Sequence, residues 1–156
     1  MLNIQIRDAE INEIPIVYQI MRAAFEEYRY KLFPPSGALR EKVKDIIKKI
    51  SNHGGAILVF ADHSPVGSAQ YYFQEDYMYI GRVSVIKDAR GMGLGKQIMK
   101  FLEEKAIENS FSKTRIEVRA SIPQNIEFYS KLNYIIIEEK KYPLGIDRWY
   151  VMNKNL

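Results

Sequence analysis

The chain has 156 residues, 47% of them hydrophobic and 27% charged, which is enough for one globular domain with its own core and too little for two enzyme domains. The absence of cysteine excludes a disulfide scaffold, a thiolate nucleophile, an iron–sulfur cluster and a cysteine zinc site, and it favours a reducing cytoplasm. The 23 Lys and Arg residues outnumber the 19 Asp and Glu residues to give a net charge of +4, spread along the chain, which favours a small anionic ligand over nucleic acid.

The N-terminal residues lack the apolar core of a signal peptide, and no run approaches the roughly 18 apolar residues of a membrane span. We therefore expect a soluble, unprocessed protein with one domain over residues 1–156. The first half of the chain shows the alternation of a strand, the spacing of two amphipathic helices and then a hairpin pattern. In chain order, the predicted elements are a strand at residues 2–7, a helix from Ile14 to Tyr28 capped by Asn12, a break at Tyr30–Gly37, a basic helix at 38–50, and antiparallel strands at Ala56–Ala61 and Val66–Phe73.

The second half begins with a strand, a helix and a further strand, the pattern of a βαβ unit with a parallel pair. Ser121 and Gln124 have the spacing of a capping box that opens a later short helix. The predicted elements are a strand at Tyr77–Ile86, a helix from Leu94 to near Asn109, a strand at Thr114–Arg119, a short helix through Leu132, and strands at Tyr134–Glu139 and Arg148–Met152. This order predicts an α/β fold, a mixed sheet with helices on both faces.

The segment between the first parallel strand and its helix is dense in glycine. The sequence Arg90-Gly-Met-Gly-Leu-Gly-Lys96 follows a buried strand and enters a helix. Such a turn exposes backbone N–H groups at the positive end of the helix dipole, where phosphate binds, and glycine lets a ligand approach the backbone. Arg90 and Lys96 add positive charge at the rim, as a pyrophosphate site requires.

Spacing narrows the choice among phosphate ligands. A P-loop requires glycine at position 90 and Ser or Thr at position 97, where this chain has Arg90 and Gln97. A dinucleotide fingerprint starting at Gly91 requires glycine at position 96, which is Lys96. The remaining pattern, Arg-x-x-Gly-x-Gly after a strand, resembles the acetyl-CoA pyrophosphate loop of the GNAT N-acetyltransferase superfamily.

A second stretch, from Asn125 to Tyr134, is similar to the late helix of that family, in which an Asn and a Phe-Tyr pair precede Leu-Gly-Phe. Here Asn133 and Tyr134 replace the Gly-Phe, and Asn tolerates the left-handed conformation of a helix end. The resemblance covers nearly the whole chain. It implies the GNAT fold, a mostly antiparallel sheet with a parallel pair and helices on both faces.

The resemblance also implies acetyl-CoA as cosubstrate, without a metal, and a pantetheine arm that pairs with the strand before the glycine loop. The residues implied to bind acetyl-CoA are Val83, Ser84, Val85, Arg90, Gly91, Met92, Gly93, Leu94, Gly95, Lys96, Asn125 and Tyr129. Acetyl transfer to an amine needs a proton for the departing thiolate. Tyr129 is the predicted general acid, because a phenol with a reference pKa of about 10 stays protonated at neutral pH, and Asn125 lies four residues away on the same helix side.

The general base is predicted to be Glu117, because the segment IEVRAS resembles the one that carries a glutamate base in ribosomal-protein N-terminal acetyltransferases. Strand alternation places Arg115, Glu117 and Arg119 on one face, so a surface ion-pair ladder is an alternative role for Glu117. Glu75 and Asp76, just before the strand at Tyr77–Ile86, are rival carboxylates that would act through water.

Acceptor recognition is predicted in two segments, the aromatic, proline-rich connector after the first helix and a turn between the last strands. The residues expected to bind the acceptor are Tyr28, Tyr30, Phe33, Ser36 and Tyr142. We predict transfer of acetyl to a primary amine of a small molecule or a protein N-terminus in a ternary complex. The alternatives are a non-catalytic acyl-CoA sensor and an RNA-binding module using the lysines of residues 38–50. We expect no nucleic-acid or membrane partner, and a monomer and a homodimer both stay open.

Overall fold

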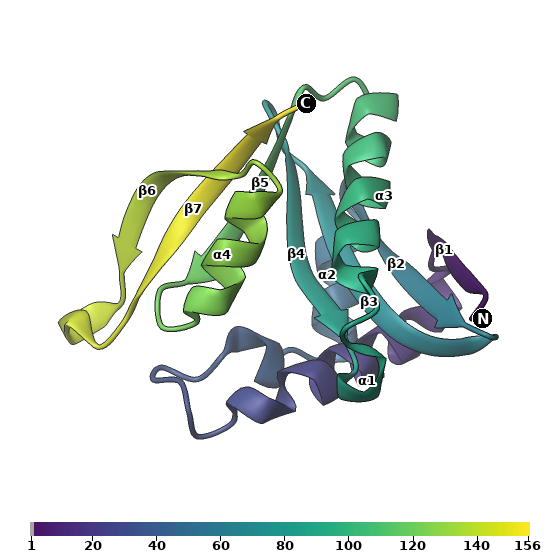
Figure 1. The fold of residues 1–156 in the computed structure, drawn as a ribbon, viewed down its shortest axis with the longest axis horizontal. Coiled ribbons are helices and arrows are strands. Elements are labelled where there is room, and N and C mark those ends of the chain that lie inside the picture. Colours follow the sequence, from purple (N-terminus) through teal and green to yellow (C-terminus); the bar gives the residue numbers. More distant parts are fainter. Residues whose placement is uncertain (1) are drawn as a thin grey trace.

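The computed structural model describes residues 2–156, and these form one sheet of seven strands in the order β1-β2-β3-β4-β5-β7-β6 (Figure 1). Neighbouring strands are antiparallel except for the parallel pair β4–β5. The mixed sheet and the parallel pair confirm the predicted fold class. The strands are β1 Ile4–Asp8, β2 Gly54–Ala61, β3 Ser64–Phe73, β4 Met78–Val85, β5 Lys113–Arg119, β6 Ile135–Lys141 and β7 Arg148–Asn155.

Helices cover both faces of the sheet. Helices α1 and α2 pack on one face in a cluster that includes Met21, Ile46 and Leu58, and α3 and α4 lie on the other (Figure 1). The run Ala56–Val59 of β2 is buried at every position, because each successive side chain meets one of the two helical layers. The helices are α1 Ile14–Phe25, α2 Val43–Ile50, α3 Leu94–Glu108 and α4 Pro123–Lys131.

Three local predictions at helix N-termini, one start and two caps, are wrong. The predicted helix at 38–50 is a 3-10 turn at Gly37–Leu39 followed by α2, which begins where the Asp45 carboxylate accepts a hydrogen bond from the backbone N–H of Lys42 at 2.9 Å. Asn12 caps no helix. It lies inside the 3-10 turn Ile11–Glu13, at whose start the Glu10 N–H donates to Glu13 Oε1 at 2.9 Å.

The third wrong prediction is the cap of α4. The residue that precedes α4 is Ile122, without a side-chain cap, and the Ser121 hydroxyl donates instead to Asp147 Oδ2 at 2.7 Å. Asp147 lies 26 residues from Ser121 in the chain, so the local sequence around Ser121 does not reveal this hydrogen bond. The end of α4 follows the prediction, since Asn133 adopts the left-handed φ of 73°.

Strands β4 and β5 separate along their length. They pair only at Met78 with Thr114 and at Tyr79 with Arg115, and beyond that point they diverge (Figure 1). On its other edge β4 carries an extra residue against β3, because Ser68 faces Ser84 while Gln70 faces Gly81. The bulge bends β4, and the separation leaves backbone groups of β4 without a strand partner on the β5 side. Among residues 2–156 no helix is long and apolar enough to cross a bilayer.

Candidate functional site

The glycine loop connects the end of β4 to the start of α3. Gly91 and Gly93 have φ values of 84° and 75°, a left-handed conformation that costs other residues energy. A Cβ at either position would meet no atom within 4 Å, so both glycines face open space. No side chain caps α3, and the first helical hydrogen bond runs from Gln97 N to Gly93 O. The first N–H groups of the helix are therefore without a backbone carbonyl and are available to a ligand.

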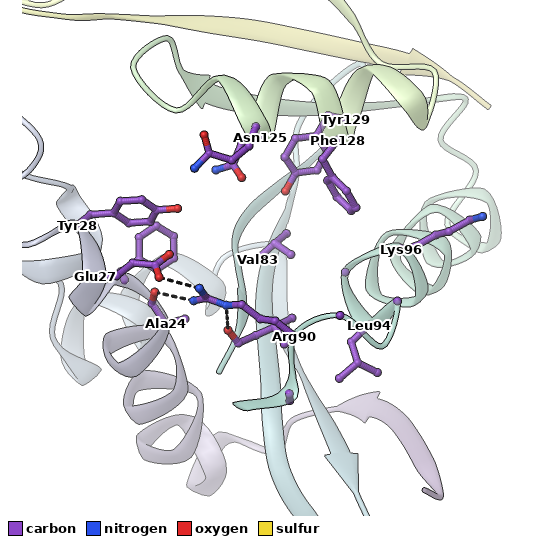
Figure 2. Close-up of a pocket in the computed structure, with 17 residues that line it drawn as sticks. Ala24, Glu27, Tyr28, Val83, Arg90, Leu94, Lys96, Asn125, Phe128 and Tyr129 are labelled. Carbon is purple, nitrogen blue, oxygen red and sulfur yellow. Dashed lines mark hydrogen bonds and ion pairs between the residues drawn. The ribbon is translucent and has the colours of Figure 1, made fainter. Parts of the chain in front are cut away.

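This loop forms one wall of a cavity of about 460 Å³ (Figure 2). The opposite walls come from the end of α1 with the turn after it and from α4. Its lining residues are Ala24, Phe25, Glu27, Tyr28, Val83, Val85, Ala89, Arg90, Gly91, Gly93, Leu94, Gly95, Lys96, Gln124, Asn125, Phe128 and Tyr129. Ten of the twelve residues predicted to bind acetyl-CoA are in this set, while Ser84 and Met92 are not.

The edge of β4 presents its main chain to the cavity. Ile86 N bonds to Val66 O on the β3 side, whereas Val85 O accepts Arg90 Nε on the opposite side at 3.1 Å. Since backbone groups of a strand alternate with period two, Val83 presents its N–H and C=O on the same side as Val85. Ser84 is buried with its hydroxyl on the carbonyl of Arg82, and the same alternation turns its backbone groups toward β3, so neither faces the cavity.

Arg90 takes a different position from the one predicted. Its guanidinium bonds to Glu27 Oε2 at 2.7 Å and to Ala24 O at 3.2 Å, which holds the glycine loop against the end of α1 (Figure 2). It is therefore a brace in this structure, and its contact with pyrophosphate stays a prediction. Leu94 is buried in the core and offers a ligand only its backbone, while Lys96 lies at the exposed rim.

Tyr129 and Asn125 project from α4 toward the cavity (Figure 2). Burial raises the pKa of Tyr129 well above its ordinary value near 10, with a smaller contribution from Tyr28. The phenol therefore stays protonated throughout the neutral and mildly alkaline range, as a general acid must. Its hydroxyl makes no hydrogen bond to any other of residues 2–156, so the proton is available to a bound group.

A second cavity of about 380 Å³ lies where β4 and β5 diverge, on the other side of Tyr129. It shares Phe25, Val83, Asn125 and Tyr129 with the first cavity, so the two meet at the phenol. Its remaining lining residues are Ser36, Gly37, Tyr79, Ile80, Gly81, Arg82, Ile116, Glu117, Val118, Arg119, Ile122, Tyr142 and Trp149. The two cavities are therefore adjacent, and the partly buried side chain of Tyr129 contributes to the wall of both.

Glu117 lines this second cavity, and the alternative ion-pair ladder for it is wrong. Arg115 bonds through Nε to Asn153 Oδ1 at 2.8 Å, and Arg119 bonds to Asp147 Oδ2 at 2.9 Å. The Glu117 carboxylate has no ion pair within residues 2–156. The rival carboxylates Glu75 and Asp76 are exposed and line neither cavity.

The residues predicted to bind the acceptor are divided by the structure. Ser36 and Tyr142 line the second cavity and Tyr28 lines the first, whereas Tyr30 and Phe33 are 85% and 60% exposed and line neither. Burial raises the pKa of Tyr28, the nearby Glu27 adds to this, and Arg90 and Asn125 partly offset it. Tyr28 therefore lies beside the contact between Arg90 and Glu27 and lines the first cavity only.

Arg119 is a residue whose role sequence reasoning missed. Its guanidinium donates to Asp147 Oδ2 and to Pro34 O at 2.7 Å, and it lies 4.6 Å from the centre of the Tyr142 ring. Tyr142 in turn packs on Trp149 with centroids 4.6 Å apart. These contacts join the connector after α1 to the last hairpin and close one end of the second cavity. The strand alternation that places Arg119 on the same face as Glu117 was the sequence feature that could have indicated this role.

The carboxyl group of Asp147 is held in its charged form as the ion-pair partner of Arg119. Burial alone would raise its pKa, but hydrogen bonds from Ser121, from the backbone N–H of Arg148 and from Arg119 outweigh burial and lower the pKa of the carboxyl. Among residues 2–156 no group of three or more histidine or acidic side chains is arranged to hold a metal ion.

Comparison with known proteins agrees with this geometry. Residues 15–134 match the model described as the acetyltransferase (GNAT) family. A curated relative, the uncharacterized N-acetyltransferase YjcF of Bacillus subtilis, is 29% identical over 96 residues, which cover 62% of this chain and 66% of the relative, just under two thirds of its length.

Two solved structures share the fold. A GNAT family acetyltransferase from Elizabethkingia anophelis with acetyl-CoA bound is 21% identical, with a TM-score of 0.76 over 99% of both chains. The PaiA N-acetyltransferase from Thermoplasma acidophilum in complex with coenzyme A is 16% identical, with a TM-score of 0.81 over 99% of both chains.

Proposed function

Because the chain belongs to the acetyltransferase (GNAT) family, we propose that it transfers acetyl from acetyl-CoA to a primary amine by direct attack in a ternary complex. The observation that carries this proposal is the meeting of two cavities at Tyr129, one beside the glycine loop and one between the diverging strands. The first cavity, which we call the cosubstrate cavity, takes acetyl-CoA. The second, which we call the acceptor cavity, takes the amine. The chain without cysteine suits turnover in a reducing cytoplasm.

The cosubstrate is held largely by main chain. The N–H groups between Gly91 and Lys96 bind the diphosphate, and no side chain competes for those at the start of α3. The edge of β4 away from β3, at Val83 and at the N–H of Val85, pairs with the amide groups of the pantetheine arm, and Asn125 adds an amide from α4. This arrangement directs the thioester toward Tyr129.

The reaction forms a C–N bond and breaks a C–S bond. The neutral amine attacks the thioester carbon, Glu117 accepts the proton that the amine loses, directly or through a water molecule, and Tyr129 donates a proton to the departing thiolate. Holding a lysine-like amine neutral at pH 7 costs about 4.6 kcal/mol, against about 1.1 kcal/mol for an α-amine. A base in the acceptor cavity therefore matters most for the more basic acceptor.

The experiment is a thiol-release assay with acetyl-CoA and a broad panel of amines, run on the wild type, Tyr129→Phe and the control Tyr134→Phe. Tyr134 is also a buried tyrosine, but its hydroxyl bonds to Thr114 and Glu103 away from both cavities. We expect Tyr129→Phe to lower kcat by about 100-fold with little change in the acetyl-CoA Kd, and the control to keep its kcat. Binding of acetyl-CoA without release of thiol for any amine would identify a sensor instead.

A further inference from the structure

The acceptor cavity presents a guanidinium group as well as the carboxylate of Glu117, which has no ion pair within residues 2–156. Arg82, on β4, lines the cavity, while Glu117 lines it from β5 across the gap between the strands. Burial raises the pKa of Tyr79, Glu117 raises it further, and Arg82 lowers it, so both charges act on one hydroxyl in the cavity. The cavity is therefore charged at two places with opposite sign.

Arg82 occupies its position at an energetic cost. It is the residue of the β4 bulge with a left-handed φ of 51°, a conformation that is unfavourable for a non-glycine residue. Its Nε donates to Glu41 Oε2 at 3.0 Å, and Lys49 Nζ lies 2.9 Å from Glu41 Oε1. Glu41 is only 6% exposed. Two cations thus share one buried carboxylate, which leaves a net charge of +1 for the cluster.

Gly37 brings the guanidinium to the cavity wall. A Cβ at Gly37 would lie 2.9 Å from Nη2 of Arg82, so glycine at this position lets the guanidinium pack directly against the backbone. Gly37 also lines the cavity, which places Nη2 at the wall. Within residues 2–156, Nη1 and Nη2 of Arg82 have no hydrogen-bond partner. Their planar fork matches the two oxygens of a carboxylate.

We propose that Arg82 binds a carboxylate of the acceptor, so that the preferred acceptor is an amino acid whose ammonium end lies at Glu117 and Tyr129. This inference rests on the proposed function. A cavity of about 380 Å³ suits a metabolite-sized molecule. A diamine fits less well, because its second ammonium would lie beside the positive cluster of Arg82, Glu41 and Lys49.

The test compares amino acids with their own carboxamides as acceptors. The pairs are glycine, β-alanine, γ-aminobutyric acid, ε-aminocaproic acid and L-leucine, each beside its amide, with rates expressed per neutral amine. We expect at least one acid to exceed its amide by about tenfold in kcat/KM. We expect Arg82→Met to remove that preference by raising the KM of the acid far more than that of the amide.

Two controls separate binding from folding. Arg82→Lys keeps a cation beside Glu41 but not the fork, so the protein stays folded and only part of the preference returns. Arg40→Met removes an exposed arginine outside the cavity and leaves the preference intact. Acetyl-CoA binding by calorimetry shows that each variant is folded.

The outcomes distinguish the two proposals. If amides, alkylamines or diamines are acetylated as well as or better than the acids, the role of Arg82 is wrong and the transferase proposal stands. If Arg82→Met retains the acid preference, the role of Arg82 is likewise overturned. If acetyl-CoA binds but no amine of either kind releases thiol, the transferase proposal falls and the inference falls with it.

Discussion

The two cavities that meet at Tyr129 differ in how the chain builds them. The cosubstrate cavity takes most of its wall from the continuous segment between Val83 and Lys96, and much of its binding capacity is main chain. The acceptor cavity takes Ser36, Arg82, Glu117 and Trp149 from four separate regions, and its capacity is in side chains. One cavity thus depends on backbone shape and the other on long-range contacts.

The two cavities therefore differ in which of the two substrates they select. A backbone site binds the same diphosphate whatever side chains surround it, so long as the glycines keep their φ values. A side-chain site changes its ligand when single residues change. We infer that the glycine loop fixes the cosubstrate, while the residues between β4 and β5 choose the acceptor.

The largest expected effect comes from breaking the backbone site. Gly93→Val places a β-branched residue at a φ of 75°, where such residues are strained, and its side chain enters the space of the diphosphate. We expect the acetyl-CoA Kd by calorimetry to rise by about 100-fold. Gly145→Val is the matched control, because Gly145 has a φ of 65° and equally open surroundings away from this cavity. An unchanged Kd in Gly93→Val would refute the assignment of the loop.

A smaller effect on rate is expected from Glu117→Gln. The glutamine amide cannot accept the proton that the amine loses. We expect the variant to lose about 30-fold in kcat/KM at neutral pH. The exposed Glu75→Gln serves as control and keeps the wild-type kcat/KM. A wild-type kcat/KM for Glu117→Gln would assign the base to another group or to water.

The smallest effect on turnover is expected at the contact that closes the acceptor cavity. Asp147→Asn removes the charge that pairs with Arg119, both side chains being nearly buried, and we expect a loss of roughly 1–3 kcal/mol in the free energy of unfolding. The acceptor KM should rise several-fold while the acetyl-CoA Kd stays constant. Equal changes in both constants would show that the contact serves the whole fold and not the acceptor side.

The lowered pKa of Asp147 gives this contact a pH dependence. A carboxyl with a folded pKa below its ordinary value stabilises the protein fully above the ordinary value, and that contribution disappears as pH falls through the folded pKa. We therefore expect the wild type, but not Asp147→Asn, to lose this part of its stability in acid. Denaturant unfolding at a series of pH values measures the difference.

Much of the fold was predictable because the chain signals its elements locally. Helical spacing located α1 and α3, and the alternating pattern with a glycine turn located the parallel pair. The cap predicted for α4 was wrong because the Ser121 hydroxyl bonds to Asp147, 26 residues away. Helix α2 is shorter than predicted because it begins at the cap formed by Lys42 and Asp45. The regular spacing of apolar residues over 38–50 does not reveal this cap.

The site divides along the same line. Ten residues predicted for acetyl-CoA line one cavity, since they belong to short motifs with fixed spacing. The ladder around Glu117 was wrong because Arg115 and Arg119 find partners in the last strand and in the loop before it. Arg82 was not identified at all, since the bulge and the room at Gly37 exist only after β3, β4 and the connector have packed together.

The most direct test is a crystal structure of the protein with acetyl-CoA. We expect the diphosphate oxygens to lie about 3 Å from the backbone nitrogens between Gly91 and Lys96, and the sulfur to lie within hydrogen-bond reach of the Tyr129 hydroxyl, facing the cavity of Glu117 and Arg82. A coenzyme bound elsewhere, or a sulfur pointing away from Tyr129, would contradict the account.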